Sequence, residues 1–315
     1  MQTLEKNTMK HSLNEQQGFH VWWRLLRPHT LTASFIPVFV GSMLAILDGS
    51  INYLLFIAML VAAMLIQAAT NMFNEYYDFI RGLDNENSVG IGGTIVRDGV
   101  KPKKVLILAI SFFATAMLLG VYICIESSWW ICAIGLFCML LGYLYTGGPY
   151  PIAYTPFGEL FAGFFMGTMI IAISYFIQTL TISSEVILIS LPIAIFIATI
   201  LLANNIRDLD GDKKNGRKTI AILIGHKNAT ALLAGSFMAC YIITITFIAI
   251  GILPIWSLIT LLSIRKATDA IKGFKGKRTN FEMIPAMVAT AQTNTIYGFL
   301  LGISLILQIV IPFSF

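Results

Sequence analysis

The sequence predicts an all-α integral membrane protein, a bundle of nine transmembrane helices with a cytoplasmic N-terminus and a C-terminus outside. Only 12% of its 315 residues are charged and 57% are hydrophobic, whereas about a quarter are charged in an ordinary soluble domain. The apolar residues gather in stretches of roughly 20, the length that a helix needs to cross the hydrocarbon core. The placement of Lys and Arg gives the orientation.

Each predicted helix is an apolar run bounded by polar or charged residues. In chain order the predicted spans are 29–47, 51–73, 105–125, 128–146, 159–180, 184–205, 229–250, 253–264 and 292–312. Gly251 and Pro254 obscure where the seventh helix stops, because both residue types interrupt helices. The eighth range is too short to span unless its helix begins earlier or tilts.

All 21 Lys and Arg residues obey the positive-inside rule. They lie in the N-terminal tail and in the loops after the second, sixth and eighth helices, and the alternate loops after the first, third, fifth and seventh helices carry none. The net charge of +5 is therefore a topology signal and gives no support for a nucleic-acid partner. We expect residues 1–20 to be a disordered polar tail without signal-peptide character, and 21–315 to form one membrane domain.

Two carboxylate clusters stand at the cytoplasmic ends of apolar runs, where charge is costly. Asn74 with Asp78 and Asn204 with Asp208 are the same Asn-x-x-x-Asp element, repeated 130 positions further along the chain. On a continuing helix Asn71 joins Asn74 and Asp78 on one face, at i, i+3, i+7 spacing. One such cluster would be equally typical of a solvated helix end, but two matched clusters on one membrane side favour a functional site.

The second cluster extends to Asp212, which on a continuing helix shares a face with Asn204 and Asp208. Oxygen-only ligands on two facing helices suit Mg²⁺, which prefers carboxylates, waters and phosphate oxygens. Basic residues accompany both clusters: Arg81, Arg97, Arg207, Arg217 and Lys218. Carboxylate-held magnesium beside Arg and Lys can bind a polyanion without repelling it, so we expect a phosphate-bearing ligand.

Two longer motifs contain these clusters. They are Asn71-Met72-Phe73-Asn74-Glu75-Tyr76-Tyr77-Asp78 with Arg81 and Asp84, and Asn204-Asn205-Ile206-Arg207-Asp208 with Asp212, Arg217, Lys218 and Thr219. Supporting segments are Arg27-Pro28-His29-Thr30, Gly92-Gly93-Thr94, Tyr143-Leu144-Tyr145-Thr146-Gly147-Gly148-Pro149 and Ala291-Gln292-Thr293-Asn294. Together they resemble the UbiA-type intramembrane prenyltransferases, and most closely the menaquinone branch, from about residue 20 to the C-terminus.

The chain departs from the common form of the first signature in two places. Four residues after Asp78, where the superfamily commonly has another Asp, stands Gly82, and the next carboxylate is Asp84. Glu75 stands where Asp is common and reaches one methylene further. The resemblance leaves the roles of Asp84 and Glu75 open.

The resemblance implies which residues form the site. The metal ligands would be Asn74, Asp78, Asp84, Asp208 and Asp212, holding Mg²⁺ on a polyprenyl diphosphate, and all of these except Asp84 would be catalytic. The diphosphate contacts would be Arg81, Arg97, Arg207 and Lys218. Candidates for contact with substrate or an allylic cation are Asn71, Tyr143, Tyr145, Asn205 and His29, although tyrosines also favour membrane interfaces and a histidine at a helix start is commonly a cap.

The implied reaction joins the prenyl group to 1,4-dihydroxy-2-naphthoate at its carboxylate-bearing carbon, releasing carbon dioxide and diphosphate and giving demethylmenaquinol. The implied location is the bacterial plasma membrane, as a multi-pass protein whose active site faces the cytoplasm. The prenyl chain length and the oligomeric state stay open.

Other functions remain as alternatives. Within the superfamily the acceptor could be 4-hydroxybenzoate, homogentisate or haem. A secondary transporter also shows internal repeats, but its ionisable groups should lie towards mid-membrane. A CDP-alcohol phosphotransferase would gather its carboxylates in one continuous signature, unlike the two separated clusters here.

Overall fold

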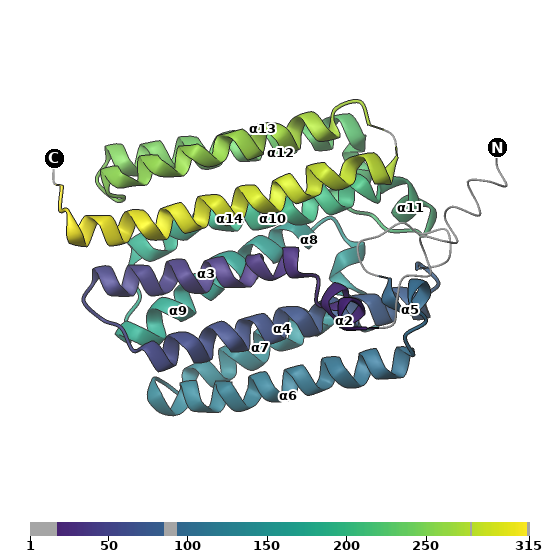
Figure 1. Cartoon of the computed structure of the whole chain (residues 1–315), viewed down its shortest axis with the longest axis horizontal. Helices are drawn as coiled ribbons and strands as arrows, with labels where there is room; N and C mark the ends of the chain where they lie inside the picture. The colour runs from purple at the N-terminus through teal and green to yellow at the C-terminus, as the bar shows by residue number, and fades with distance from the viewer. Residues whose placement is uncertain (1–17, 85–92, 278, 314–315) are drawn as a thin grey trace.

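The computed structural model describes residues 18–84, 93–277 and 279–313, with the side chain of His29 excepted. Within these ranges the chain is helical without any strand, and the long helices lie side by side in one bundle (Figure 1). The elements are α2 (Phe19–Leu26), α3 (Pro28–Leu47), α4 (Tyr53–Ile80), α5 (Thr94–Arg97), α6 (Pro102–Glu126), α7 (Trp130–Leu144), η1 (Ile152–Tyr154), α8 (Gly158–Ala162), η2 (Gly163–Met169), α9 (Ile170–Thr179), α10 (Ser184–Arg207), α11 (Leu209–Lys214), α12 (Ile220–Ala249), η3 (Ile255–Ser263), α13 (Ile264–Phe274) and α14 (Asn280–Val310).

Seven of the described helical segments are long and apolar enough to cross a membrane. They are Thr30–Leu47, Tyr53–Ile80, Pro102–Glu126, Gly158–Thr179, Ser184–Arg207, Ile220–Ala249 and Asn280–Val310. The remaining two predicted segments correspond to α7, a shorter apolar helix, and to η3 followed by α13. The chain is therefore a multi-pass, all-helical membrane protein.

Several helices extend further than hydropathy indicated, because polar residues continue the helix past the apolar run. The second was expected to end at residue 73, but α4 continues to Ile80 and carries the first acidic cluster. The ninth was expected from residue 292, but α14 begins at Asn280, behind a capping box of Thr279 and Glu282. The eighth was expected over 253–264, but η3 and α13 together run from Ile255 to Phe274.

Close helix packing depends on small residues. A Cβ added at Gly163 would lie 2.6 Å from the Ala194 carbonyl oxygen, and one at Gly167 would lie 2.5 Å from the Ala194 Cα. The Gly-x-x-x-Gly pair thus lets the π-helical turn η2 pack directly on the α10 backbone. Gly298 and Gly302 similarly let α14 pack against α3.

The core also contains hydrogen-bonded hydroxyls. In the 3₁₀ helix η3, Ser257, Thr260 and Ser263 recur every third residue and are fully buried, as three residues per turn requires for one face. Ser257 Oγ lies 2.8 Å from Ser304 Oγ of α14, and Ser263 Oγ lies 2.7 Å from the Tyr241 hydroxyl of α12. These pairs join three helices inside the bundle.

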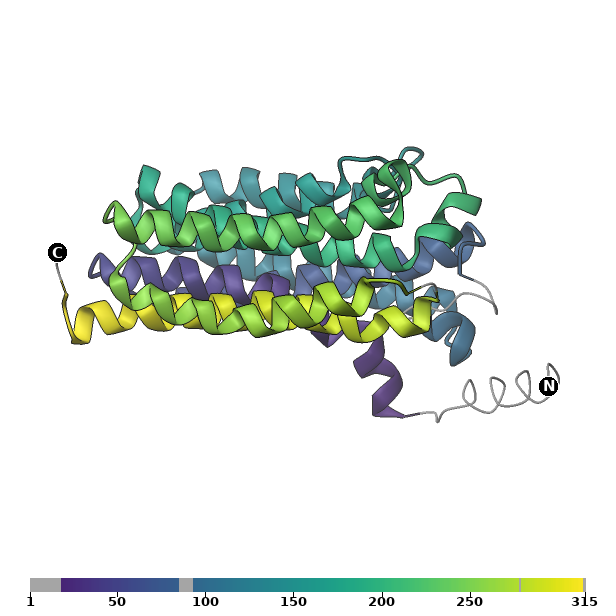
Figure 2. The same cartoon turned by 90° about the horizontal axis from the view of Figure 1, so that it is seen from above.

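The short helices α2, α5 and α11 lie towards the end of the bundle where α4 and α10 finish (Figure 1). There α5 and α11 cover the helix ends, and α2 projects from the bundle across its axis (Figure 2). Helix α2 begins at Phe19, inside the expected 1–20 tail, while residues 1–17 lie outside the described residues. This end of the molecule carries both acidic clusters.

Candidate active site

The first acidic cluster lies on the last three turns of α4. Because α4 is continuous to Ile80, Asn71, Asn74 and Asp78 share one face, as the spacing predicted. The Asn71 amide is fully engaged at the junction of α2 and α3: its Nδ2 donates to the Leu26 carbonyl at 3.1 Å and to Thr30 Oγ1 at 2.9 Å. Asn71 thus holds the N-terminal helices against α4.

After α4 the chain reverses direction tightly, so the backbone of Asp84 lies next to Asp78. Gly82 has a positive φ of 72°, which favours glycine, and ends α4. The backbone N–H groups of Leu83 and Asp84 then donate to the Asp78 carbonyl at 2.8 and 3.2 Å. Glycine at the position of the usual third acidic residue therefore brings a carboxylate back to Asp78 without helical spacing.

Burial raises the pKa of the Asp84 carboxyl to about 6. The Asp78 charge adds to this rise, whereas the charge of Arg27 opposes it. Asp84 is thus a shielded carboxyl beside the first cluster.

Glu75 has a structural partner. Its side chain is completely buried, and Oε1 accepts hydrogen bonds from the Thr94 hydroxyl and from the Ile95 N–H, the latter at 3.0 Å. These two residues open α5, so the carboxylate holds that short helix on α4. The extra methylene of Glu relative to Asp gives it this reach, while Oε2 is buried without a hydrogen-bond partner.

The second cluster lies at the junction of α10 and α11. The expected continuous helix is interrupted here: α10 ends at Arg207, and Asp208 links it to α11. The Asp208 and Asp212 N–H groups still donate to the carbonyls four residues earlier, at 3.0 and 2.8 Å, so the break is slight. Asp208 binds the Arg207 guanidinium at 2.7 and 2.5 Å, while Asp212 is buried.

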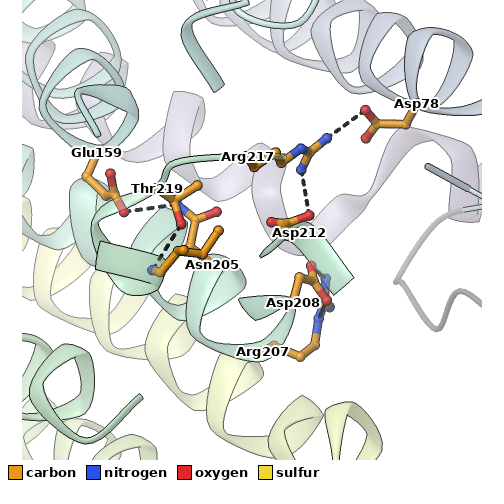
Figure 3. Close-up of polar contacts among 9 residues, drawn as sticks. Asp78, Glu159, Asn205, Arg207, Asp208, Asp212, Arg217 and Thr219 are labelled. Atoms are coloured by element: carbon orange, nitrogen blue, oxygen red, sulfur yellow. Dashed lines mark hydrogen bonds and ion pairs between the residues drawn. The ribbon is translucent and has the colours of Figure 1, made fainter. Parts of the chain in front are cut away.

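One arginine joins the two clusters. Arg217 Nη2 donates to Asp78 Oδ1 at 2.8 Å, and Nη1 donates to Asp212 Oδ1 at 3.1 Å (Figure 3). Burial alone would lower the pKa of Arg217, but the two carboxylates raise it above its ordinary value. Burial also raises the pKa of Asp212 to about 6, against the effect of Arg217. Two motifs far apart in the sequence thus meet at one cation.

A third segment, the chain that follows α7, contacts the arginines of the site. Arg81 donates to the carbonyl oxygens of Thr146 and Gly148 at 2.5 and 2.8 Å. The Tyr154 ring packs against both Arg81 and Arg217, whose guanidinium carbons lie 5.5 and 5.0 Å from its centroid. Tyr154 therefore holds two arginines of the site in place.

The predicted tyrosines differ in position. The Tyr143 hydroxyl lies 2.7 Å from that of Tyr77, whereas Tyr145 lines a cavity that leads from the acidic clusters into the bundle. The cavity has a volume of about 380 Å³. Its lining runs along α4 from Asn74 to Met59, about 22 Å at the helical rise. Asn204, Arg27 and Thr30 line the polar end, and the rest is mainly apolar.

The oxygen donors of the two clusters fit a hard divalent cation. Asn74 Oδ1 and Asp212 Oδ2 are buried without hydrogen-bond partners, and Asp78 and Asp212 already share a guanidinium. Among the described residues no three His, Cys, Asp or Glu side chains converge tightly enough to hold a metal by themselves. Mg²⁺ does not require such a cage, because it keeps waters and binds substrate phosphates as well.

The remaining predicted site residues are Arg97, Lys218, His29 and Asn205. Arg97 ends α5, the Lys218 side chain is exposed, and the His29 side chain lies outside what the structure describes. Asn205 turns to α8, where its Nδ2 donates to Glu159 Oε1 at 2.9 Å (Figure 3).

Some residues of the site were absent from the predicted set. Arg217 has a signal, because it belongs to the second motif and is one of the basic residues beside the clusters, whereas Tyr154 and Glu159 have none in the sequence. Their contacts with Arg81, Arg217 and Asn205 depend on the folded chain.

The fold and site define a class of helical membrane proteins in which two acidic motifs meet at the polar end of an apolar cavity. The chain belongs to the UbiA prenyltransferase family, which it matches over residues 34–271. It is 56% identical to the 1,4-dihydroxy-2-naphthoate octaprenyltransferase of Bacillus subtilis over 288 residues, covering 91% of this chain and 93% of that protein. The family expected from the motifs is confirmed.

More distant relatives agree. The 1,4-dihydroxy-2-naphthoate octaprenyltransferase of Mycobacterium tuberculosis is 28% identical over 86% of this chain and 91% of its own. The structure of a UbiA homolog from Archaeoglobus fulgidus bound to DMAPP and Mg²⁺ superposes with a TM-score of 0.62 at 18% identity, covering 88% of this chain and 96% of that one. The apo UbiA homolog from Aeropyrum pernix gives a TM-score of 0.66 at 16% identity, covering 89% and 98%. These likenesses show the fold.

Proposed function

We propose that this protein transfers a polyprenyl group from polyprenyl diphosphate to 1,4-dihydroxy-2-naphthoate, releasing diphosphate and carbon dioxide and forming demethylmenaquinol for menaquinone biosynthesis. The observation that carries the proposal is the meeting of both acidic clusters, through Arg217, beside an apolar cavity. The extensive identity to the Bacillus subtilis protein supports the acceptor.

The clusters would hold the diphosphate through Mg²⁺. Asn74, Asp78, Asp84, Asp208 and Asp212 supply the oxygen ligands, and the ion would neutralise the leaving diphosphate. Arg217 lies between the clusters and would contact the diphosphate when its carboxylates hold the metal, with Arg81, Arg97, Arg207 and Lys218 as further candidate diphosphate contacts. The diphosphate leaves with the C–O electron pair.

The cavity would hold the prenyl chain and protect the allylic cation from water. The electron-rich ring attacks this cation at its carboxylate-bearing carbon. The bond to the carboxylate then breaks, its electron pair restores the aromatic ring, and carbon dioxide departs. Tyr145, which lines the cavity, would stabilise the cation through its ring.

We further propose that the chain crosses the bacterial plasma membrane nine times, with its N-terminus and active site on the cytoplasmic side and its C-terminus outside. The distribution of all 21 Lys and Arg residues supports this topology.

Purified protein in detergent tests the function directly. With Mg²⁺, a polyprenyl diphosphate and carboxyl-labelled 1,4-dihydroxy-2-naphthoate, we expect a prenylated product and labelled carbon dioxide, and EDTA should stop both. Full turnover by the Asp78→Ala or Asp208→Ala variant would contradict the two-cluster mechanism. Turnover only with 4-hydroxybenzoate, homogentisate or haem would keep the family and reject the acceptor, and substrate uptake by proteoliposomes without product would indicate transport.

A further inference from the structure

Arg27 has an unusual backbone at the junction between α2 and α3. Its φ of 51° and ψ of 65° lie in the left-handed region, which residues other than glycine rarely adopt. Its N–H closes α2 on the Arg24 carbonyl at 3.0 Å, and its own carbonyl accepts from the Thr30 N–H at 2.8 Å and from Thr30 Oγ1 at 2.9 Å. Hydrogen bonds on both sides therefore hold an arginine where a glycine would be less strained.

The Arg27 side chain lines the cavity. It is the only charged side chain in the described part of the lining, and Thr30, Gln67, Asn71 and Asn74 lie in the same polar end. Arg27 Nε is buried without a hydrogen-bond partner. A cation in this position is costly unless an anion joins it.

Within the described residues, no carboxylate lies within ion-pair distance of Arg27. Asp84 is near enough to respond to its charge but is not paired with it. The other arginines of this end have partners of their own: Arg24 binds Asp98, Arg81 binds the Thr146 and Gly148 carbonyls, Arg207 binds Asp208, and Arg217 binds Asp78 and Asp212. Arg27 is therefore available to an anion that enters the cavity.

We propose that Arg27 binds the carboxylate of the aromatic acceptor. The inference rests on the proposed function, which brings two anions into one site. The diphosphate belongs with the metal at the two acidic clusters and with Arg217, so the acceptor carboxylate requires a separate cation. A guanidinium can bind a carboxylate through two parallel hydrogen bonds, which fixes the orientation of the ring as well.

An uncharged neighbour of Arg27 suits the rest of the acceptor. Gln67 presents an amide to the same end of the cavity, where it can bond to a ring hydroxyl group. Decarboxylation then removes the charge that Arg27 holds. The site thereby distinguishes the anionic acceptor from its neutral product and favours product release.

Equilibrium binding of two probes to the protein, without metal or prenyl diphosphate, tests the proposal. The probes are 1-hydroxy-2-naphthoate and 1-naphthol, which share the hydroxylated ring and differ in the carboxylate. We expect Arg27→Gln to weaken binding of the carboxylate probe about tenfold or more, the size of a charged hydrogen-bonded contact, and to leave 1-naphthol unchanged. Arg27→Lys should restore part of the loss.

Arg265→Gln is the matched control, because it removes the same charge from an exposed position on α13. It should bind both probes as the wild type does. Equal weakening of both probes by Arg27→Gln, in protein that melts like the wild type, would overturn the proposal in favour of a packing role. Unchanged naphthoate binding with weaker binding of Mg²⁺-diphosphate would overturn it in favour of a diphosphate contact.

The test also separates this inference from the proposed function. Wild-type protein that fails to prenylate 1,4-dihydroxy-2-naphthoate would reject the acceptor. A selective loss of naphthoate binding in Arg27→Gln would still establish a carboxylate site in the cavity.

Discussion

Asp78 and Asp212 share the guanidinium of Arg217, at 2.8 and 3.1 Å from the respective Oδ1 atoms. The first carboxylate ends a membrane helix and the second belongs to α11. In this arrangement a protein cation binds carboxylate oxygens that we propose as metal ligands. A metal held by these carboxylates would compete with Arg217 for the same oxygens, and a diphosphate would offer Arg217 another partner.

This competition predicts opposite effects of Arg217→Gln on two ligands. Without diphosphate, Mn²⁺ should bind more tightly, because two carboxylate oxygens are released from an ion pair. Binding of Mg²⁺-diphosphate should weaken about tenfold or more, because a charged contact is lost. Electron paramagnetic resonance of Mn²⁺ and calorimetry measure the two affinities.

Lys218→Gln is the control for Arg217→Gln, since it removes the same charge at the next residue, whose side chain is exposed. An equal increase in Mn²⁺ affinity in both variants would mean that general charge repulsion, and not occupation of the carboxylates, causes the effect.

Metal binding should depend on pH through the buried carboxyls. In the metal-free protein the pKa values of Asp84 and Asp212 are about 6, above the ordinary 3.8. Above pH 6 both carboxyls are charged and open to Mg²⁺, whereas protons compete below it. We expect the apparent Mg²⁺ dissociation constant to rise about tenfold per pH unit below 6 for each proton displaced.

The same pKa shifts determine how the stability of the metal-free protein changes with pH. Between about pH 4 and pH 6 the folded protein binds more protons than the unfolded chain. These groups therefore stabilise the fold most below pH 4, and that contribution is lost as the pH rises through 6. The melting temperature measured in EDTA should fall as the pH rises from 4.5 to 7.5. Added Mg²⁺ should raise it again above pH 6. A constant Mg²⁺ stabilisation from pH 5 to 7 would contradict this.

Glu75→Asp should destabilise the protein although it restores the more common residue of the signature. The shorter side chain cannot reach Thr94 and Ile95, so two hydrogen bonds to a buried carboxylate are lost, at about 1.5–3 kcal/mol each. The melting temperature should fall, while the Mn²⁺ affinity of the folded protein stays close to that of the wild type. A large loss of metal affinity at unchanged stability would instead make Glu75 a ligand.

Gly167→Ala should destabilise the bundle by about 1–3 kcal/mol, because the new Cβ meets the α10 backbone. Gly235→Ala in α12 is the control, since its Cβ would have no atom within 4 Å. Thermal melts of both variants compare them. Equal melting temperatures would show that η2 and α10 separate at little cost.

The class of fold and the pairing of the two clusters could be predicted from sequence, because hydropathy and repeated spacing are local signals. The geometry of Asp84 could not, since it depends on the positive φ of Gly82. The hydrogen bonds between Glu75 and α5 could not be predicted either, because the first signature marks Glu75 only as an acidic residue. Partners such as Tyr154 and Glu159 are set by contacts distant in sequence.

The long 3₁₀ helix η3 makes the eighth predicted segment longer than an α-helix of the same number of residues. A 3₁₀ helix rises about 2.0 Å per residue and an α-helix about 1.5 Å, so Ile255–Ser263 extends about 18 Å where an α-helix would extend about 13.5 Å. The α13 helix that follows carries Arg265, Lys266, Asp269 and Lys272, so the apolar part of the segment ends at Ile264. A tighter winding thus compensates for an apolar run that is short in residues, and the buried hydroxyls on every third residue stabilise that winding.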